Sequence, residues 1–530
     1  MLEYLKKEKL HNCILVVLII LGSGTKIGTS LTLTITLNSL ISKQMEAFIF
    51  WTMVNITFWA LWILQQYVLT VQKKKVICKM SAAIRNDVAD RLSQASYETF
   101  HKEDTGAYVS WLCNDVKLIE DSAFESFYMI LDAVFTAFFS VVSLWSYHPA
   151  LVGVTLAASI FIMVVPNLKS ISTYLQESVK KYSFENELFI AKITDTLQGF
   201  DEFFSYNLQE RMLNSIDQSS VQFNRAAVQN TRKQSRVNTL VLIINVAGQL
   251  IVNLSAGILI IFGYISAGTI LSVGQFAGNI FNSLGNISSY VVAINSTIPV
   301  FNKLKNIEMM KDSNISVERV DNIQLEHVNY NYGNGAVFHH DIQMSFQEGG
   351  KYAIVGESGS GKSTLMNILS GKLLGYEGSI RVGGEELKKL SSTFLREQII
   401  LINQKPYLFN TTVRDNILMG RNIDEGRLNE ILEASDLTSV ISNLPNGLDT
   451  SITGNGSNLS GGQRQRITLA RAMAFGRKIL ILDEGTSALN QESAFKIEST
   501  LLENPELTII MITHHLQKEI EERLTAVYKI

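Results

Sequence analysis

Residues Gly356 to Thr364 match the pattern G-x-x-x-x-G-K-[ST] and follow the apolar run 352–355. The run predicts a buried strand, and the residues after the motif predict a helix. Glycines at such a junction let backbone N–H groups surround a phosphate at the helix N-terminus, where the helix dipole favours anions. The alternative is a glycine-rich turn that only caps a helix. The expected phosphate-binding residues are Gly356, Glu357, Ser358, Gly359, Ser360, Gly361, Lys362, Ser363 and Thr364.

Two side chains of this motif have a predicted role in the chemistry of a bound nucleotide. Lys362 can reach the β- and γ-phosphates of ATP, and Ser363 can offer its hydroxyl to Mg²⁺. A second apolar run, 479–482, ends in Asp483 and Glu484. An acid at a strand end beside a phosphate loop suits Mg²⁺ coordination, here by Asp483, and Glu484 would orient or deprotonate the attacking water. Two acids at a strand end are otherwise only a solvated terminus.

The segment 459–463, Leu-Ser-Gly-Gly-Gln, lies between these two features and is followed by Arg464-Gln465-Arg466. It resembles the signature motif of ABC ATPases, which no other phosphate-loop class carries at that position. The resemblance implies that the motif completes the nucleotide site of a partner chain, so that one ATPase domain per chain requires two chains. The residues assigned to ATP on this basis are Ser460, Gly461, Gly462 and Gln463.

Three further residues resemble functional positions of the same family. Gln404 resembles the glutamine of the Q-loop, which implies a role in catalysis and at Mg²⁺. His514 resembles the catalytic switch histidine. Tyr332 resembles the aromatic residue that stacks on adenine, although a tyrosine taken alone is more often part of a core. Together with Lys362 and Glu484, the resemblance assigns Gln404 and His514 to the catalytic set.

Residues 321–530 alternate β-rich runs with helical stretches, which predicts an α/β P-loop NTPase fold with a parallel sheet. We expect an ABC-type ATP-binding domain over this range that is short at its C-terminal end. Two departures from the family pattern stand out. Asn490 occupies a position where the family usually has aspartate, and the segment 453–456 replaces an acidic segment that often precedes the signature.

Residues 1–310 predict a membrane α-helical bundle of the exporter type. Six stretches are long and apolar enough to span the hydrocarbon, which takes about 20 residues. Long polar stretches separate spans two and three, and spans four and five. We therefore expect spans two to five to continue as helices well beyond the bilayer. The expected spans are 12–40, 46–70, 120–147, 150–174, 237–264 and 268–298.

Lysine clusters orient this bundle. Lys6, Lys7 and Lys9 precede the first span, and the run 73–79 with four lysines follows the second. Such clusters favour the cytoplasmic side, so we expect a multi-pass protein of the cell membrane whose N-terminus and ATPase domain are both cytoplasmic. The net charge of -3 gives no reason to expect a nucleic-acid partner.

The two long polar connections also resemble intracellular loops of exporter-type ABC proteins. Residues 100–106 with 114–115 resemble the first loop, and 197–204 resemble the second. In that family, short coupling helices in these loops dock on the ATPase domains. For Phe200, Phe203 and Phe204 the alternative is ordinary helix packing, because aromatic residues at helical spacing are usually core.

This resemblance predicts an ATP-hydrolysing transporter subunit that works by alternating access. Export of a peptide or another polar compound is the favoured direction; the alternatives are an exporter-shaped importer of a siderophore or metal chelate, or a multidrug efflux pump. A soluble ABC ATPase that remodels nucleic acid is disfavoured by the six spans, and an ATP-gated channel by Glu484 and His514. A homodimer is favoured over a heterodimer with a related half-transporter, for which Asn490 is mild evidence.

Polar residues inside the predicted spans are the basis for predicting the polarity of the substrate. Lys26 and Asp132 are expected to pair or to line the substrate path, unless one of them reaches the interface. Amides and hydroxyls at helical spacing are expected to face the bundle interior or a cavity, which suits a polar substrate; the alternative is hydrogen bonding between helices. These stripes are Asn245, Gln249 and Asn253 in span five; Gln275, Asn279, Asn282 and Asn286 in span six; and Thr25, Thr29, Thr32 and Thr36 in span one.

Overall fold

The computed structural model describes the chain except for residues 165–168, 308, 310–314, 333–334, 358 and 514–515. The chain divides into two compact units. Unit 1 comprises Met1–Arg91 and Asp104–Ile307, and unit 2 comprises Leu92–Glu103 and Glu308–Ile530. The segment Leu92–Glu103 therefore belongs to the C-terminal unit, although the boundaries expected from the sequence, 1–310 and 321–530, place it in the first domain.

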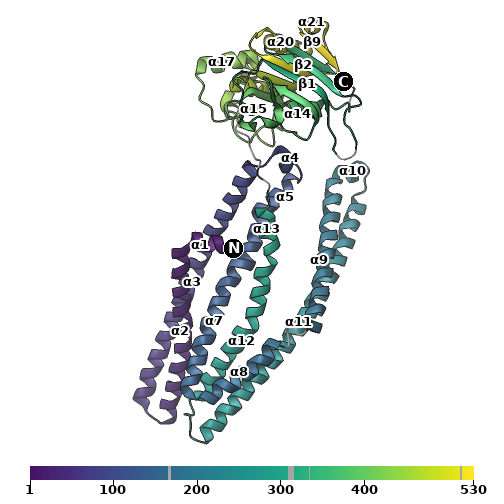
Figure 1. The fold of residues 1–530 in the computed structure, drawn as a ribbon. Coiled ribbons are helices and arrows are strands. Elements are labelled where there is room, and N and C mark those ends of the chain that lie inside the picture. Colours follow the sequence, from purple (N-terminus) through teal and green to yellow (C-terminus); the bar gives the residue numbers. More distant parts are fainter. Residues whose placement is uncertain (165–168, 308, 310–314, 333–334, 358, 514–515) are drawn as a thin grey trace. The chain divides into compact units, whose positions relative to one another are not determined.

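The described residues of unit 1 form helices joined by short connections (Figure 1). Two π-helical segments, η1 (Trp111–Asp115) and η2 (Ile119–Phe124), continue α5 and α6 into α7 without a break. The remaining bounds are α1 (Leu2–Lys7), α2 (Lys9–Ile41), α3 (Met45–Ser93), α5 (Thr105–Ser110), α6 (Val116–Leu118), α7 (Glu125–Tyr147), α8 (Pro149–Val164), α9 (Lys169–Gln198), α10 (Phe200–Ser205), α11 (Gln209–Ile261), α12 (Thr269–Ser296) and α13 (Ile298–Lys305).

Two tight turns connect helices of unit 1. The chain reverses between α2 and α3 at residues 42–44, where Lys43 adopts a left-handed conformation with φ of 56°. It reverses again between α7 and α8, and Pro149 begins α8, a position where proline costs no hydrogen bond. The connection between α11 and α12 is longer. It runs over 262–268 and contains Gly263 with φ of +77°.

The six expected spans lie on helix except for residues 262–264, 268 and 297, which lie outside the helices, and for the undescribed residues 165–168. Four helices among the described residues are long and apolar enough to cross a bilayer: Lys9–Ile41, Met45–Ser93, Thr105–Tyr147 and Gln209–Ile261. The fourth expected span carries the shorter apolar stretch Pro149–Phe161, and the sixth, α12, is helical over 28 residues. Helices α3 and α11 contain 49 and 53 residues. At 1.5 Å per residue they extend roughly 75 and 80 Å, well beyond a hydrocarbon core of about 30 Å, as expected.

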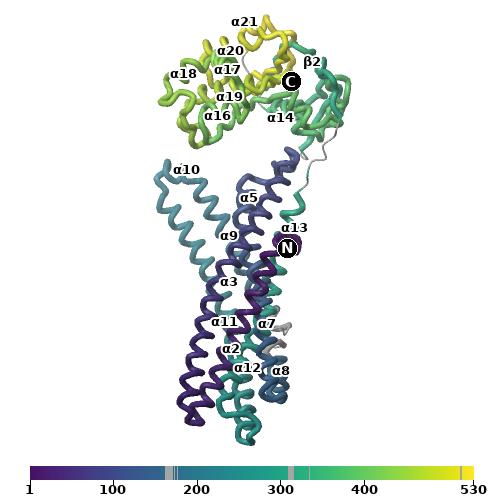
Figure 2. Tube along the Cα trace, turned by 90° about the vertical axis from the view of Figure 1, so that its left-hand side faces the viewer, coloured from purple at the N-terminus to yellow at the C-terminus, as the bar shows by residue number. Residues whose placement is uncertain are grey.

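The core of unit 1 lies where α12 packs against α7, α2 and α11. Its centre is formed by the buried rings of Phe276 and Phe281 on α12, with Leu144 of α7 and Val252 of α11. Helices α9 and α11 run side by side, and the short helix α10 closes the hairpin between them at one end (Figure 2). This hairpin is built from long, mostly polar helices, as expected for a segment outside the hydrocarbon.

Unit 2 contains two sheets, which confirms the α/β fold. An antiparallel sheet has the order β2-β1-β4-β5, and a parallel sheet has the order β6-β7-β8-β3-β9. The bounds are β1 (Asn322–Asn329), β2 (Ile342–Gln347), β3 (Lys351–Val355), β4 (Glu377–Val382), β5 (Glu385–Glu386), β6 (Ile399–Ile402), β7 (Ile479–Asp483), β8 (Thr508–Ile512) and β9 (Ala526–Lys529).

Helices surround the parallel sheet and form a separate cluster beside it. The helix α14 follows β3, and α19 and α20 flank β7 in the sequence. The bounds are α4 (Tyr97–Phe100), α14 (Lys362–Leu369), η3 (Leu387–Lys389), α15 (Ser392–Gln398), α16 (Val413–Leu418), α17 (Glu425–Ala434), α18 (Thr438–Ser442), η4 (Gly447–Asp449), α19 (Gly461–Phe475), α20 (Gln491–Glu503) and α21 (Lys518–Glu521).

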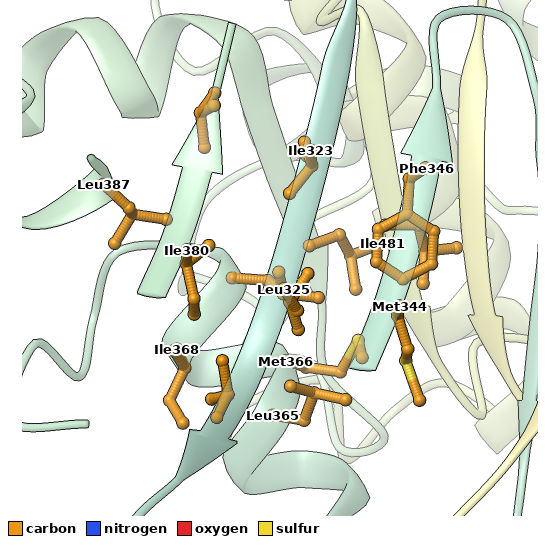
Figure 3. Close-up of a cluster of buried hydrophobic side chains, with 14 of the residues drawn as sticks. Ile323, Leu325, Met344, Phe346, Leu365, Met366, Ile368, Ile380, Leu387 and Ile481 are labelled. Atoms are coloured by element: carbon orange, nitrogen blue, oxygen red, sulfur yellow. The ribbon is translucent and has the colours of Figure 1, made fainter. Parts of the chain in front are cut away.

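Three apolar clusters hold unit 2 together. The first lies between the two sheets and includes α14 (Figure 3), where Ile323, Leu325 and Phe346 of the antiparallel sheet meet Leu365 and Ile481. The second joins α16, α17 and α18 to α19, and the third joins the opposite face of the parallel sheet to α19 and α20. The helix α19 takes part in two of these clusters, so it connects the helical part of the unit to the parallel sheet.

Candidate functional site

The phosphate-loop residues connect β3 to α14, as predicted. Gly359 and Gly361 have φ of +88° and +92°, and a Cβ on Gly361 would lie 2.6 Å from the ring of Phe338, so only glycine fits there. The N-terminus of α14 begins at Lys362 directly after this turn. Ser358 lies outside the described residues. The loop therefore has the strand, the left-handed glycines and the helix start that a phosphate site requires.

The Lys362 ammonium lies inside this loop. Its side chain is buried, and Nζ donates to the carbonyl oxygens of Gly356 at 2.8 Å and Glu357 at 2.5 Å. The amine is thus held where the loop closes around its ligand. A phosphate group would compete with these carbonyls for the ammonium, which is the contact expected of Lys362.

The first turn of α14 meets the end of β7 at the predicted Mg²⁺ position. The hydroxyl of Ser363 donates to Asp483 Oδ2 at 3.0 Å, which joins the phosphate loop to the end of β7. A hydroxyl and a carboxylate are oxygen ligands of the kind Mg²⁺ prefers, with water and phosphate oxygens completing its shell. Among the described residues, no group of three or more His, Cys, Asp or Glu side chains could hold a metal. The site therefore fits a nucleotide-bound Mg²⁺ rather than a metal held by protein alone.

The structure also joins two predicted catalytic residues that are 80 positions apart. Gln404 Nε2 donates to Glu484 Oε2 at 2.6 Å. Gln404 follows β6 and Glu484 follows β7, and these strands are neighbours in the sheet, so their carboxyl ends bring the two side chains together. His514, the other residue of the predicted catalytic set, lies outside the described residues.

Tyr332 is exposed rather than part of the core. Its ring is 60% accessible, and its hydroxyl lies 3.4 Å from Thr364 Oγ1 on α14. It contacts the buried ring of Tyr330 edge to face, with 4.8 Å between centroids. The core alternative for Tyr332 is therefore wrong. An exposed aromatic face beside the phosphate-loop helix is available for stacking on a base.

The signature segment forms the start of α19. Ser460 is the N-cap: its hydroxyl accepts from Gln463 N at 3.2 Å, and Gln463 Oε1 accepts from Ser460 N at 2.8 Å. Such a reciprocal capping box leaves the N–H groups of Gly461 and Gly462 available at a helix terminus that favours anions. Within the described part of the chain, no hydrogen bond joins Ser460–Gln463 to the phosphate loop. This agrees with a motif that serves a site on another chain.

The two departures from the family pattern have local explanations. Asn490 is the N-cap of α20, and its Oδ1 accepts from Ser493 N at 3.0 Å. Asparagine caps helices about as well as aspartate, so the substitution keeps the helix start and removes only the charge. In the segment 453–456, Asn455 Oδ1 accepts from Leu408 N at 2.8 Å. The segment thus supports the loop after Gln404, although it has no acidic residue.

The first predicted coupling segment contacts the ATPase unit. Its helix, α4, lies a few residues earlier than the motif expected at 100–106 and is capped by Ser96. Glu98 on α4 accepts from the Tyr330 hydroxyl at 3.4 Å and from Leu374 N at 3.3 Å. The Lys372 ammonium lies 5.1 Å from the centroid of the Tyr97 ring. Burial lowers the pKa of Lys372.

The second predicted coupling segment is α10. Phe200 and Phe204 are 48% and 63% exposed and stack on each other at 6.0 Å. These two rings are therefore not core residues of this chain, whereas Phe203 is half-buried. Asp201 and Glu202 give the first turn of α10 a negative charge.

The polar stripes of the predicted spans have different surroundings. On α11, Asn245 is buried; it donates to Asn282 of α12 at 3.0 Å and accepts from Gln249 at 2.7 Å. A Cβ on Gly278 of α12 would lie 3.2 Å from Gln249 Nε2, so α11 and α12 approach closely there. The α11 stripe therefore follows the alternative of hydrogen bonding between helices.

The span-one stripe bonds mainly within its own helix, and Asn55 of α3 also donates to Thr32 Oγ1 at 2.7 Å. The hydroxyls of Thr25, Thr29, Thr32 and Thr36 each donate to a carbonyl three or four residues earlier. Asp132 accepts from Ser23 Oγ at 3.4 Å, and among the described residues no ion pair within 4.0 Å joins it to Lys26. On α12, by contrast, Gln275, Asn282 and Asn286 are exposed on the surface of the chain.

Sequence reasoning missed Gln465, which is 3% exposed on α19. Its side-chain amide bonds to the segment that follows Glu484. The only signal in the sequence was its position two residues after the signature glutamine, on the helix face opposite to solvent.

The chain resembles known transporters over nearly its whole length. A family model described as ABC transporter transmembrane region matches residues 13–284, and one described as ABC transporter matches residues 339–487. The chain is 28% identical over 461 residues to a probable ABC transporter ATP-binding/permease protein of Haemophilus influenzae, covering 82% of this chain and 80% of the relative. It is 27% identical over 478 residues to an ATP-dependent lipid A-core flippase of Francisella tularensis, covering 85% and 75%.

A third relative and a solved structure complete the comparison. The transport/processing ATP-binding protein ComA of Streptococcus pneumoniae is 28% identical over 342 residues, covering 62% of this chain and 47% of that protein. A bacterial Atm1-family ABC exporter with ATP bound has the same fold, with a TM-score of 0.83 over 98% of this chain and 93% of that chain at 20% identity. The chain belongs to the ABC transporter family and is an ATP-hydrolysing half-transporter of exporter fold that works in a lipid bilayer as a dimer.

Proposed function

We propose that two copies of this chain form a homodimer that exports a polar, hydrogen-bonding compound such as a peptide. The observation that carries this proposal is the amide stripe of α12. Gln275, Asn282 and Asn286 are exposed on the single chain, within a span that must meet lipid, protein or water. The amide oxygens of Gln275 and Asn282 already accept from Ser30 Oγ and Asn245 Nδ2 within the chain. Amide N–H groups in contact with lipid would lack acceptors, so this face lines a cavity shared with the second subunit. Neutral donors and acceptors there favour a polar substrate.

The nucleotide site is composed of residues from both subunits. ATP would be held between the phosphate loop of one chain, where Tyr332 can stack on adenine, and Ser460–Gln463 of the other. Ser363, Asp483 and Gln404 would hold Mg²⁺, which would neutralise charge on the phosphates. The Glu484 carboxylate, already hydrogen-bonded to Gln404, orients or deprotonates the attacking water, and His514 completes the catalytic set.

The coupling helix α10 has a complementary surface on unit 2. A cavity of about 560 Å³ lies between α4 and the strand β6, and its lining includes the cations Lys372, Arg396 and Arg477 but no acidic side chain among the described residues. The aromatic rings and the acidic first turn of α10 match this combination of apolar and cationic surface. We infer that α10 of the partner subunit docks there and transmits the ATP cycle to the membrane helices.

The orientation follows from the lysines around the first two spans. They place the N-terminus and the ATPase domain in the cytoplasm, with α3, α9 and α11 extending into it from the cell membrane.

Substrate class is tested with the purified chain in nanodiscs and in inside-out vesicles. Peptides, lipids, hydrophobic drugs and metal chelates are compared for stimulation of ATPase activity and for ATP-dependent uptake. We expect peptides or other polar compounds to stimulate and to be taken up. The variants Asn279→Leu and Asn286→Leu should abolish this uptake and keep basal ATPase activity, whereas the control Leu271→Met on the same helix should transport normally. Uptake of a lipid or a hydrophobic drug that is unaffected by both asparagine variants would overturn the proposal.

A further inference from the structure

The buried amide of Gln465 joins two functional segments of the same subunit. Gln465 Nε2 donates to the backbone oxygen of Glu484 at 3.3 Å and to Ser487 Oγ at 3.4 Å. Its Oε1 accepts from Ala488 N at 2.9 Å. The side chain is 3% exposed, so these bonds are shielded from water, and removing either half of the amide leaves a backbone group without that partner.

The backbone that Gln465 contacts is in an uncommon conformation. Glu484 has φ of 50°, in the left-handed region that a non-glycine residue adopts at a cost of roughly 1 kcal/mol or more. Its N–H donates to Ile512 O at 3.2 Å, and its carbonyl also accepts from Ser487 N at 3.1 Å. This conformation directs the Glu484 side chain towards Gln404. The Gln465 amide therefore stabilises the turn that sets the direction of the proposed catalytic carboxylate.

Gln465 lies on the same helix as the signature motif. Ser460 is the N-cap of α19, and Gln465 is five residues further, roughly 7.5 Å along the axis. The helix is rigid over this distance because its apolar face is buried in two core clusters. A displacement of the helix start by ATP bound to the partner subunit is therefore accompanied by a displacement of the Gln465 side chain.

We propose that Gln465 is a positioning residue that couples the two ATP sites of the dimer. One helix contacts the partner's ATP through Ser460 and holds its own subunit's Glu484 and Ala488 through Gln465. Engagement of ATP at one site then fixes the backbone of the catalytic glutamate at the other. The proposal rests on the ATP-bound dimer described above, and it adds a residue outside the phosphate-binding, Mg²⁺-binding and signature sets.

The test uses two substitutions that preserve side-chain length in the full-length dimer. Gln465→Met removes both the donor and the acceptor. Gln465→Glu keeps an oxygen for Ala488 N but removes the donor to Glu484 O when it is ionised. The control is Thr468→Val on the same helix, because the Thr468 hydroxyl donates to a carbonyl of its own helix, Arg464 O, at 3.0 Å. Turnover, KM for ATP and melting temperature are measured for each protein.

We expect both Gln465 variants to lower kcat by about tenfold, equivalent to roughly 1.4 kcal/mol in the barrier. KM for ATP should change less than about twofold, because no hydrogen bond joins Gln465 to Tyr332 or to the described residues of the phosphate loop. For Gln465→Glu the loss relative to wild type should shrink at lower pH, since a protonated carboxyl donates again. Thr468→Val should retain wild-type kinetics.

A second measurement separates positioning from mere stability. In a Glu484→Gln background the catalytic carboxylate is absent, so adding Gln465→Met should lower the residual rate less than twofold. An additive tenfold loss in that background, or wild-type kcat in both Gln465 variants, would overturn the proposal. If Gln465→Met fails to fold, the pH dependence of Gln465→Glu decides: a loss that is independent of pH counts against the amide's role.

Discussion

Substitution of Glu484 by glutamine isolates the chemical role of its carboxylate. The change affects the bond from Gln404 Nε2 to Glu484 Oε2, which is 2.6 Å long. Glutamine at position 484 keeps an oxygen of the same reach, so Gln404 still has an acceptor. The backbone bonds of residue 484 to Ile512 and Ser487 do not involve the side chain. The variant should therefore fold like wild type.

The magnitudes for folding and for catalysis differ clearly. A hydrogen bond to a charged group contributes about 1.5–3 kcal/mol and a neutral one about 1 kcal/mol. Gln404 is exposed and Glu484 half-buried, and solvent reduces this difference, so we expect a stability loss below about 1 kcal/mol. Loss of a positioned general base lowers turnover by about a hundredfold or more, which is roughly 2.7 kcal/mol in the barrier. The loss of rate should thus far exceed the loss of stability.

The assay compares steady-state ATP hydrolysis with nucleotide binding in nanodiscs. Glu484→Gln should bind ATP with wild-type affinity and accumulate as a closed, ATP-bound dimer, detected by cross-linking or by single-particle imaging. The control is Glu492→Gln, an exposed acid in the first turn of α20, which should turn over normally. Unchanged hydrolysis in Glu484→Gln would remove this residue from the mechanism. A melting temperature lowered in proportion to the rate would refute the separation of fold and chemistry.

Three further outcomes follow from the contacts of other residues. Ser363→Ala removes the hydroxyl bonded to Asp483, so the Mg²⁺ concentration for half-maximal ATPase activity should rise about tenfold, as read in a Mg²⁺ titration. Burial raises the pKa of Glu498 above 4.5, so the folded state loses stability as pH rises through that raised value. Glu498→Gln removes this ionisation. The variant should therefore have a higher melting temperature than wild type at pH 7 and nearly the same one at pH 4. Gly278→Val places a side chain against Gln249 and should destabilise the α11–α12 contact by about 1–3 kcal/mol. Its melting temperature in nanodiscs should fall accordingly. The control Gly257→Val should keep the wild-type melting temperature, because no atom lies within 4 Å of the added Cβ.

The nucleotide site was largely predictable because its signals are local. A phosphate loop requires glycines at fixed positions between a strand and a helix, and Gly359 and Gly361 have the expected left-handed backbone. The acids after the second strand were equally predictable, since the carboxyl ends of neighbouring parallel strands meet at one edge. The order of the strands is what joins Ser363 to Asp483 and Gln404 to Glu484. Sequence alone supplied the residues but not these pairings.

The polar stripes of the membrane helices show where sequence reasoning fails. Helical periodicity identifies which residues share a face, but it says nothing of what covers that face. Asn245 and Asn282 differ in burial, although the same periodicity marks their two stripes. The threonines of α2 have the same spacing, yet their hydroxyls donate hydrogen bonds to carbonyl oxygens of their own helix. Spacing therefore predicts an amphipathic helix, and only the packing of neighbouring helices determines its use.

The position of Gln465 could not be derived from spacing either, because its partners lie 19 to 23 residues away across a strand. A buried glutamine on an otherwise apolar helix face needs partners, and this requirement was the only clue in the sequence. The segment after Glu484 supplies them because its turn leaves a carbonyl and an N–H outside the strand ladder. Such a contact depends on how α19 lies against β7, which is a property of the fold.

Three surfaces in the described part of a single chain carry groups that favour further contacts. The rings of Phe200 and Phe204 are exposed at the end of the α9–α11 hairpin, the amides of α12 are exposed within a span, and the capped start of α19 is not bonded to its own phosphate loop among the described residues. Apolar rings favour burial, amides in a bilayer require polar neighbours, and a helix N-terminus favours an anion. In the proposed homodimer, a second copy arranged around a two-fold axis would offer further contacts to all three surfaces. A heterodimer would need a related chain that supplies the same three complements, so the homodimer is the simpler assembly.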